Sequence, residues 1–121
     1  LTKGIPLEDG IVDEIRAVDV LEHLADKIAI VNEIWRVLKP GGTAEIVVPS
    51  SDGRGAWMDP THVSYWNALS FWYYQAGNPH RETFGDAYGI QARFDILELG
   101  EIRNEEFGIV HVRAVLRAVN A

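Results

Sequence analysis

The chain contains no cysteine among its 121 residues. This absence excludes a disulfide scaffold, a thiol nucleophile and zinc sites built on thiolates. It also fits a reducing compartment, so we expect a cytoplasmic protein. Apolar runs fall short of the about 20 residues that a membrane span requires, and no charged-then-apolar leader opens the chain. We therefore expect no membrane partner.

Basic residues are scarce, with 11 Lys and Arg against 18 Asp and Glu, for a net charge of -7. The basic residues are also scattered along the chain. A nucleic-acid backbone normally requires clustered Lys and Arg. We therefore expect no nucleic-acid partner.

Several catalytic and metal-binding motifs are missing. The chain has neither the G-x-S-x-G turn of serine hydrolases nor the G-x-x-x-x-G-K turn of nucleotide-binding proteins. His23, His62 and His80, with Asp59 or Asp86, lack the H-x-H or H-x-x-x-H spacing of common metal sites. We therefore expect no metal site.

The most informative pattern is one strand-helix-strand crossover. Residues 12–18 form an apolar run that suits a buried parallel strand, and Asp26 is a suitable helix N-cap. Apolar residues then recur at spacings of three and four, which predicts a helix that ends at Pro40-Gly41-Gly42. Residues 44–48 follow as a second apolar strand. No glycine-rich cofactor-binding turn precedes residue 12.

The loop after the first strand carries Asp19, Glu22 and His23. Ligands of open α/β sheets bind just outside the carboxyl ends of the strands. The loop is therefore a candidate binding or acid-base site, with a simple helix cap as the alternative role for Glu22 and His23.

Residues 50–90 hold three of the four tryptophans and all four tyrosines. Residues 67–76 predict a short helix with loops on both sides, and long insertions of this kind often form substrate pockets. Trp57, Tyr65 and Trp66 are the candidates for substrate contact. A satellite core beneath the loop is the alternative that we favour for the aromatic cluster.

The carboxyl-terminal part alternates with the two-residue period of strands. Residues 93–103 and 108–120 carry this pattern, and a turn-like segment joins them. We expect an antiparallel hairpin.

The segments IPLEDGIVDEIRAVDVLEHL, EIWRVLKPGG and AEIVVP together resemble the second half of a class I S-adenosylmethionine-dependent methyltransferase. The resemblance covers residues 4–50 well, while DPTHVSYWNALSFWYY and the hairpin agree more loosely. It implies an α/β fold: a partial Rossmann-like sheet equivalent to strands four to seven, with an antiparallel last strand and an aromatic helical insertion. We expect a single truncated domain over residues 1–121.

The resemblance also implies a site. The loop after the family's fourth strand lies beside the methionine part of S-adenosylmethionine, which assigns Asp19, Val20 and Leu21 to the cofactor. Glu22, His23 and His62 become candidate catalytic residues, because a histidine with an ordinary pKa of about 6.5 suits a general base at neutral pH. For His62, a surface-loop histidine bonded to Asp59 is the alternative.

The expected function is methyl transfer to an unidentified acceptor, with a small-molecule substrate. The upstream glycine-rich half of the family's cofactor site is missing, which makes binding of S-adenosylmethionine by this chain alone doubtful. The alternative is a non-catalytic module that dimerises or binds a small molecule. Without the first three strands, residues 12–18 form an unpaired edge, which predicts either a homodimer through that strand or an incomplete gene product. The chain begins at Leu1 and not Met, so we expect a start that was processed, trimmed or never captured.

Overall fold

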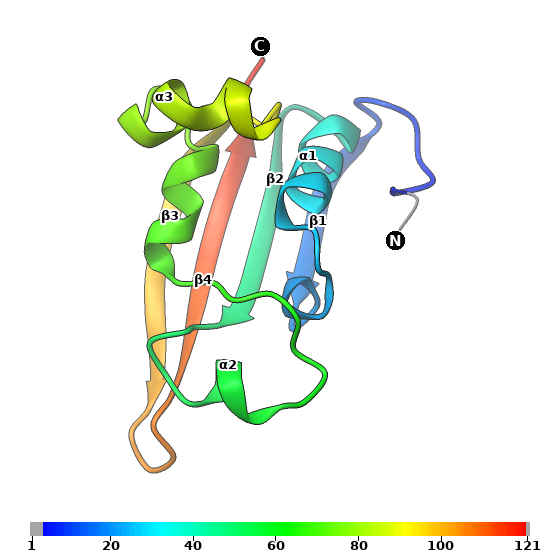
Figure 1. Ribbon diagram of the computed structural model, residues 1–121. Coiled ribbons are helices and arrows are strands. Elements are labelled where there is room, and N and C mark those ends of the chain that lie inside the picture. Colours follow the sequence, from blue (N-terminus) through cyan, green and yellow to red (C-terminus); the bar gives the residue numbers. More distant parts are fainter. Residues whose placement is uncertain (1–3, 121) are drawn as a thin grey trace.

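One four-stranded sheet organises the computed structural model, which describes residues 4–120 (Figure 1). The strand order is β1-β2-β4-β3. Strand β1 pairs with β2 in parallel, and β4 runs antiparallel to both β2 and β3. The antiparallel last strand and the hairpin are therefore confirmed. The strands are β1 (Val12–Val18), β2 (Leu38–Pro49), β3 (Phe94–Asn104) and β4 (Ile109–Ala118).

Helix α1 (Lys27–Val37) makes the crossover between β1 and β2. The side chain of Asp26 accepts a hydrogen bond from the backbone N–H of Ala29 at 3.0 Å, which confirms the expected N-cap. The helix buries its apolar stripe against the sheet, namely Ile30, Val31, Ile34 and Val37.

The helix ends earlier than the sequence predicts. The backbone of Leu38 is already extended, with ψ 137°, and β2 begins there and contains the Pro-Gly-Gly turn. Lys39 stays extended as well, because the residue before a proline avoids the helical conformation. A Cβ on Gly42 would lie 2.9 to 3.1 Å from three backbone carbonyl oxygens, two of them on β1. Glycine therefore lets β1 and β2 approach each other at this point.

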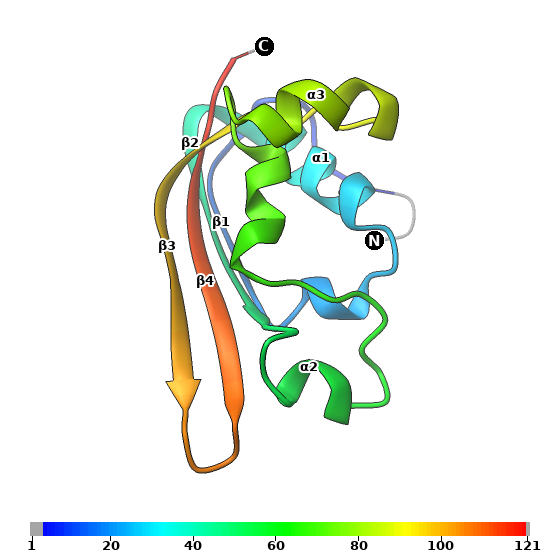
Figure 2. The same ribbon diagram turned by 60° about the vertical axis from the view of Figure 1, so that its left-hand side comes forward.

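All the helices lie on one face of the sheet (Figure 2). Besides α1 they are η1 (Leu21–His23), α2 (Gly55–Met58), η2 (Ala68–Tyr74) and α3 (Pro79–Tyr88). Buried residues of β2 and β4 meet Trp66 and Phe71 in the core between these layers. Helix η2 confirms the expected helix within residues 67–76, in 3-10 form with Asn67 as its cap.

The expectation of loops on both sides of that helix is wrong, because α2 and α3 form there. Helix α3 has clear terminal signals: Asn78 caps it, Pro79 opens it, and Gly89 ends it with φ +78°. Its buried residues are Arg81 and Gly85 and not an apolar stripe. The periodicity that identifies most helices is therefore missing from α3.

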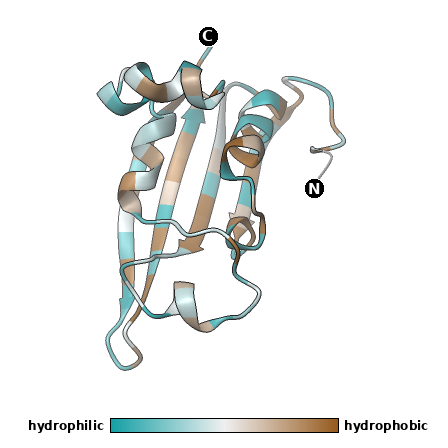
Figure 3. Ribbon diagram, in the orientation of Figure 1, coloured by the Kyte–Doolittle hydropathy of each residue, from teal (hydrophilic) through white to brown (hydrophobic). Residues whose placement is uncertain are grey.

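The opposite face of the sheet carries a row of ion pairs across all four strands. Arg16 of β1 contacts Glu45 of β2 at 2.8 Å, Glu45 contacts Arg113 of β4 at 2.7 Å, and Arg113 contacts Glu98 of β3 at 3.4 Å. No helix covers this face among residues 4–120. The strands alternate between hydrophobic and hydrophilic residues accordingly (Figure 3).

Strand β1 is more exposed than the expected buried parallel strand. It forms one edge of the sheet, and of its residues only Ala17 is buried. The strand has a neighbour on one side only, and one of its faces is open, so its charged residues reach solvent. The prediction of its position and direction holds, but that of its burial is wrong.

The segment before β1 is held against α1 by Arg36. The Arg36 guanidinium donates to the carbonyl oxygens of Ile5 and Leu7 at 2.9 Å and to Asp9 at 2.7 Å. Glu33 accepts from the backbone N–H of Ile5 at 2.9 Å and binds Arg36 at 2.7 Å. We call this set the Arg36 clasp. The expected loop over residues 1–11 is seen from Gly4 onward, and residues 1–3, including Leu1, lie outside the described residues.

Helices of the described part of the chain are too short or too polar to cross a membrane.

Candidate functional site

A polar pocket of about 460 Å³ lies at the carboxyl ends of β1 and β2. Its charged and titratable lining residues are Asp19, Glu22, His23, Asp59, His62 and His111. The position is the one where open α/β sheets bind ligands. Every residue expected to act in catalysis therefore borders one pocket.

Asp19 ends β1 in a left-handed conformation with φ +56°, which no other non-glycine residue between 4 and 120 adopts. Aspartate tolerates this conformation better than most residues. The backbone N–H of Asp19 donates to the carbonyl of Val47 at 2.9 Å. Its carboxylate lies 3.6 Å from Nε2 of His111. Such backbone strain concentrates at functional sites.

Glu22 is a buried acid with an exposed fraction of 2%. Its backbone carbonyl accepts from the N–H groups of Val63 and Ser64 at 2.8 and 3.1 Å, which ties η1 to the loop that follows α2. Burial raises the pKa of the Glu22 carboxyl. Its Oε1 atom has no hydrogen-bond partner among the described residues. A buried acid with an unsatisfied oxygen is a strong candidate for a functional role.

Two histidines face Glu22. The ring Nδ1 of His62 lies 3.1 Å from the carbonyl oxygen of Ala56, and Nδ1 of His23 lies 3.2 Å from that of Thr61. A carbonyl oxygen only accepts, so each Nδ1 carries a hydrogen and donates. The Nε2 atoms are left to face Glu22 Oε2, at 3.9 Å from His62 and 3.7 Å from His23.

A long loop brings His62 to this position. After β2, residues 50–66 leave the sheet, and the loop closes where the N–H of Ser51 donates to the carbonyl of Trp66 at 2.6 Å. This closure places His62 over the end of β2, next to η1. The rings of His62 and His23 then meet edge to face, with centroids 5.0 Å apart.

Asp26 and Asp59 bear on the alternative roles of Glu22, His23 and His62. Asp26, and not Glu22 or His23, caps α1. Asp59 Oδ2 does lie 3.6 Å from Nε2 of His62, but the His62 side chain is only 7% exposed. Asp59 also accepts from Thr61 through Oδ1, and these hydrogen bonds lower the pKa of Asp59. His62 is thus a buried member of the pocket with Asp59 beside it.

Comparison with known proteins places the amino-terminal part in a family. Residues 2–46 match the methyltransferase domain family. A probable S-adenosylmethionine-dependent methyltransferase of Mycolicibacterium smegmatis is 38% identical over 68 residues, which cover 53% of this chain and 26% of that protein. The amino-terminal part of the chain is therefore similar to S-adenosylmethionine-dependent methyltransferases. Asp19, Glu22 and His23 lie inside the matched region, and His62 lies outside the family match.

Solved structures show the same fold. The putative methyltransferase bound to the Trm112 activator of Haloferax volcanii has a TM-score of 0.63 and 19% identity over 96% of this chain and 58% of its own. The [4+2]-cyclase SpnF has a TM-score of 0.65 and 17% identity over 98% of this chain and 53% of its own. The chain spans just over half of these structures and about a quarter of the curated relative. Because one of the two structures is a cyclase, the fold alone does not determine the chemistry.

The three residues expected at the cofactor differ in their exposure to solvent. Asp19 has a side chain that is 54% exposed, and Val20 is 37% exposed, so both reach the surface at the end of β1. Leu21 is 1% exposed and packs in the core, which leaves only its backbone for a ligand. An aspartate and an apolar residue here fit the ammonium and methylene groups of the methionine part of S-adenosylmethionine. The described residues thus fit one side of that cofactor.

Two of the residues expected at the substrate stack on each other. Trp57 and Tyr65 have ring centroids 4.4 Å apart, and Trp57 Nε1 donates to the carbonyl of Ser51 at 3.0 Å. Trp57 remains 60% exposed. The pair therefore offers an open aromatic surface formed by α2 and by the loop that carries His62.

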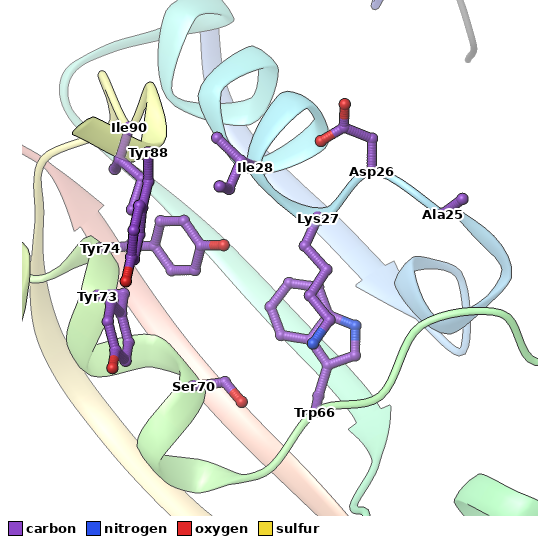
Figure 4. Close-up of a pocket in the computed structure, with 10 residues that line it drawn as sticks. All are labelled: Ala25, Asp26, Lys27, Ile28, Trp66, Ser70, Tyr73, Tyr74, Tyr88 and Ile90. Carbon is purple, nitrogen blue, oxygen red and sulfur yellow. The ribbon is translucent and has the colours of Figure 1, made fainter. Parts of the chain in front are cut away.

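Trp66 belongs to the core and also borders a pocket. It is 1% exposed and belongs to the core, as the favoured interpretation of the aromatic cluster states. Its ring also borders a second pocket of about 590 Å³, where it faces Lys27, Ser70, Tyr73, Tyr74 and Tyr88 (Figure 4). The ammonium of Lys27 lies 5.4 Å from the centroid of the Trp66 ring. Burial lowers the pKa of Lys27 and raises that of Tyr74 to about 12.

A third hollow, of about 800 Å³, adjoins both pockets. It shares His23 with the polar pocket and Ala25 and Asp26 with the aromatic pocket. The segment from His23 to Asp26 therefore contributes to the walls of all three hollows.

Some features of the polar pocket could not be predicted from the sequence. The backbone carbonyls of Ala56 and Thr61 orient the two imidazoles, and every residue has a carbonyl, so the sequence does not distinguish these two. His111 of β4 also lines the pocket beside Asp19, although a histidine at an alternating position within a strand is typical of a structural residue.

Proposed function

We propose that this chain forms the acceptor side of the active site of an S-adenosylmethionine-dependent methyltransferase acting on a small molecule. The observation that supports this most is the convergence of Glu22, His23 and His62 in the polar pocket, next to the loop that carries Asp19. Enzymes of this class work largely by holding a nucleophile in line with the methyl group. Few catalytic side chains are then needed.

The proposed chemistry is removal of a proton from the acceptor. His62 donates through Nδ1 to the Ala56 carbonyl, so its Nε2 lone pair is free to take a proton from an acceptor hydroxyl or ammonium group. The carboxylate of Glu22 stabilises the imidazolium that forms, and His23 stands on its other side. S-adenosylmethionine, when bound, supplies the methyl group. Asp19 binds the ammonium group of the cofactor in this arrangement.

Weak cofactor binding by the chain itself is the first test. With ¹⁵N-labelled protein and S-adenosylhomocysteine, we expect saturable shifts at the amides of residues 19–23, and weaker binding for Asp19→Asn. Binding near a Kd of about 1 mM corresponds to about 4 kcal/mol, which one side of the cofactor site suffices to supply. Absence of shifts at these amides would contradict cofactor binding at the β1 end.

The second test measures transfer from methyl-labelled S-adenosylmethionine to small acceptors carrying hydroxyl, amine or carboxyl groups. We expect transfer to one class, and a fall of at least about 100-fold for His62→Ala, as for loss of a general base. His80→Ala is the matched control, because His80 lies outside the polar pocket. Equal losses in both variants, or no transfer to any class, would count against the proposal.

A second candidate function rests on the free edge of β1. The strand stands at the end of the sheet order, and its outer side has no strand neighbour among the described residues. Exposed edges of this kind pair with other chains. We propose as the alternative a non-catalytic module that dimerises through β1.

A further inference from the structure

We propose that Glu22, His23 and His62 bind a divalent transition-metal ion such as zinc. One ligand atom from each residue lies within 4.8 Å of the other two. The residues come from η1 and from the loop after α2, so their spacing in the sequence gives no hint of a metal site. The expectation of no metal site considered spacing alone, and the fold brings the residues together without it.

The first argument is the orientation of the two imidazoles. Both donate their Nδ1 hydrogen to a backbone carbonyl, which leaves both Nε2 lone pairs directed at the same carboxylate. Metal-binding histidines usually have this outer hydrogen bond, which fixes the tautomer and the ring orientation. Here it occurs twice in one cluster.

The second argument is the unsatisfied carboxylate. Glu22 is almost fully buried, and its Oε1 has no partner among residues 4–120. Its Oε2 lies 3.7 and 3.9 Å from the two Nε2 atoms, which is too long for hydrogen bonds. With Glu22 ionised and both imidazoles neutral, these three atoms are all acceptors, and no hydrogen-bond donor lies between them. A cation resolves this arrangement.

The ligand atoms are farther apart than in a formed metal site. Two ligand atoms on tetrahedral zinc, with bonds of about 2.0 Å, are separated by roughly 3.3 Å. Glu22 Oε2 lies 3.7 and 3.9 Å from the two Nε2 atoms, and all three atoms lie within 4.8 Å of one another. Metal binding therefore requires these side chains to move closer together, and the His23 ring, which is 39% exposed, has solvent on one side in which to turn.

The donor set also selects the kind of ion. Two imidazoles and one carboxylate suit zinc and other first-row transition ions, whereas magnesium prefers oxygen ligands. Three protein ligands leave a coordination position open, as in catalytic zinc sites. That position opens into the polar pocket, where Asp59 Oδ2 is 3.6 Å from Nε2 of His62. Water or an oxygen atom of a substrate fits there.

Metal binding does not depend on the proposed methyl transfer. If the chain also transfers methyl groups, which rests on the proposed function, an ion in this site would bind the acceptor hydroxyl and lower its pKa, and the proton would pass to water. His62 would then be a metal ligand in place of the general base described above. The competing occupant is a proton, which would make one imidazole an imidazolium paired with Glu22. The experiment separates these two cases.

The test is titration of the untagged, metal-free chain with Zn²⁺ by calorimetry, and with Co²⁺ by visible absorption. We expect one ion per chain, a visible Co²⁺ band, and little binding of Mg²⁺. Glu22→Gln and His62→Asn should each weaken Zn²⁺ binding by about 100-fold or more, the upper range for changes around metal sites. His80→Asn is the matched control and should bind like the unchanged chain.

The proposal is overturned if Zn²⁺ binds no more tightly than about 1 mM, a free energy near 4 kcal/mol that scattered surface groups also reach. It is also overturned if Glu22→Gln binds as well as the unchanged chain, or if His80→Asn loses binding equally. Circular dichroism of each variant guards against unfolding. Zn²⁺ should also raise the unfolding temperature of the unchanged chain and leave that of Glu22→Gln unmoved.

Discussion

Glu22 is a residue whose features reduce the stability of the fold and suit a functional role. Its carboxylate is buried, its pKa is raised by that burial, and one oxygen lacks a partner. Such a group costs stability in the metal-free chain and is retained where activity needs it.

We therefore expect Glu22→Gln to raise the free energy of unfolding of the metal-free chain by about 1 kcal/mol at pH 7. The substitution removes a buried charge, and the new amide N–H is able to donate to Nε2 of His23 or His62. Urea unfolding measures the change. A clear loss of stability would mean that the carboxylate makes a favourable interaction that the contacts described above do not contain.

How far the polar pocket could be predicted also depends on single residues. Asp19, Glu22 and His23 follow a predicted strand, so their place at the sheet end could be read from the sequence. His62 was chosen through a family resemblance, and its burial beside Glu22 arises from the return of residues 50–66. That return depends on backbone hydrogen bonds, which residue types do not reveal. The unsatisfied Oε1 of Glu22 likewise has no counterpart in the sequence.

At the scale of elements, those with strong periodicity were the ones that could be predicted. Strand β1 has the expected bounds, α1 has the expected cap, and the hairpin has the expected direction. Helix α3 was missed because it turns Arg81 inward, where Nε donates to the carbonyl of Ala92 at 2.8 Å. Because a backbone carbonyl accepts the hydrogen bond of this buried arginine, the inner face of α3 contains a charged residue, and the sequence lacks the apolar pattern of a buried helix face.

The Arg36 clasp gives an element-scale prediction on pH. Hydrogen bonds from Arg36, and then from the N–H of Ile5, lower the pKa of Glu33 below its ordinary value of 4.5. A carboxyl with a lowered folded-state pKa contributes stability above its unfolded pKa and loses it as the pH falls through the folded value. Glu33→Gln should therefore cost about 1 kcal/mol at pH 7 and much less near pH 3.

Urea unfolding of both proteins at several pH values measures this difference. The gap between the unchanged chain and Glu33→Gln should close as the pH falls below about 4.5. A gap that stays constant down to pH 3 would show that the carboxylate charge is not the source of the stabilisation.

At the scale of the whole molecule, the sheet is covered on one face only. The other face carries the ion-pair row from Arg16 to Glu98, which suits contact with water better than a dry interface. The Arg36 clasp keeps residues 5–9 on α1, so this segment does not cover the outer side of β1. The free edge therefore remains the most available surface for a second copy.

If the chain dimerises through β1, its mass by light scattering should rise from monomer to dimer with concentration. Val18→Lys should shift it back to the monomer, because Val18 is 40% exposed on that strand and a charge there opposes pairing. Ile102→Lys on β3, at the opposite edge, is the control and should still dimerise. A monomer at every concentration would rule out the edge-paired dimer.

The two hydrogen bonds from Val63 and Ser64 to the carbonyl of Glu22 have a consequence for motion. These two bonds, which we call the seam, join η1 to the loop that carries His62. The two segments therefore move apart only when both bonds break. The rate at which these two amides exchange with deuterium therefore records how often the polar pocket comes apart. Any ligand that bridges Glu22 and His62 will slow that exchange, whatever its chemical nature, because it holds the two sides of the seam together.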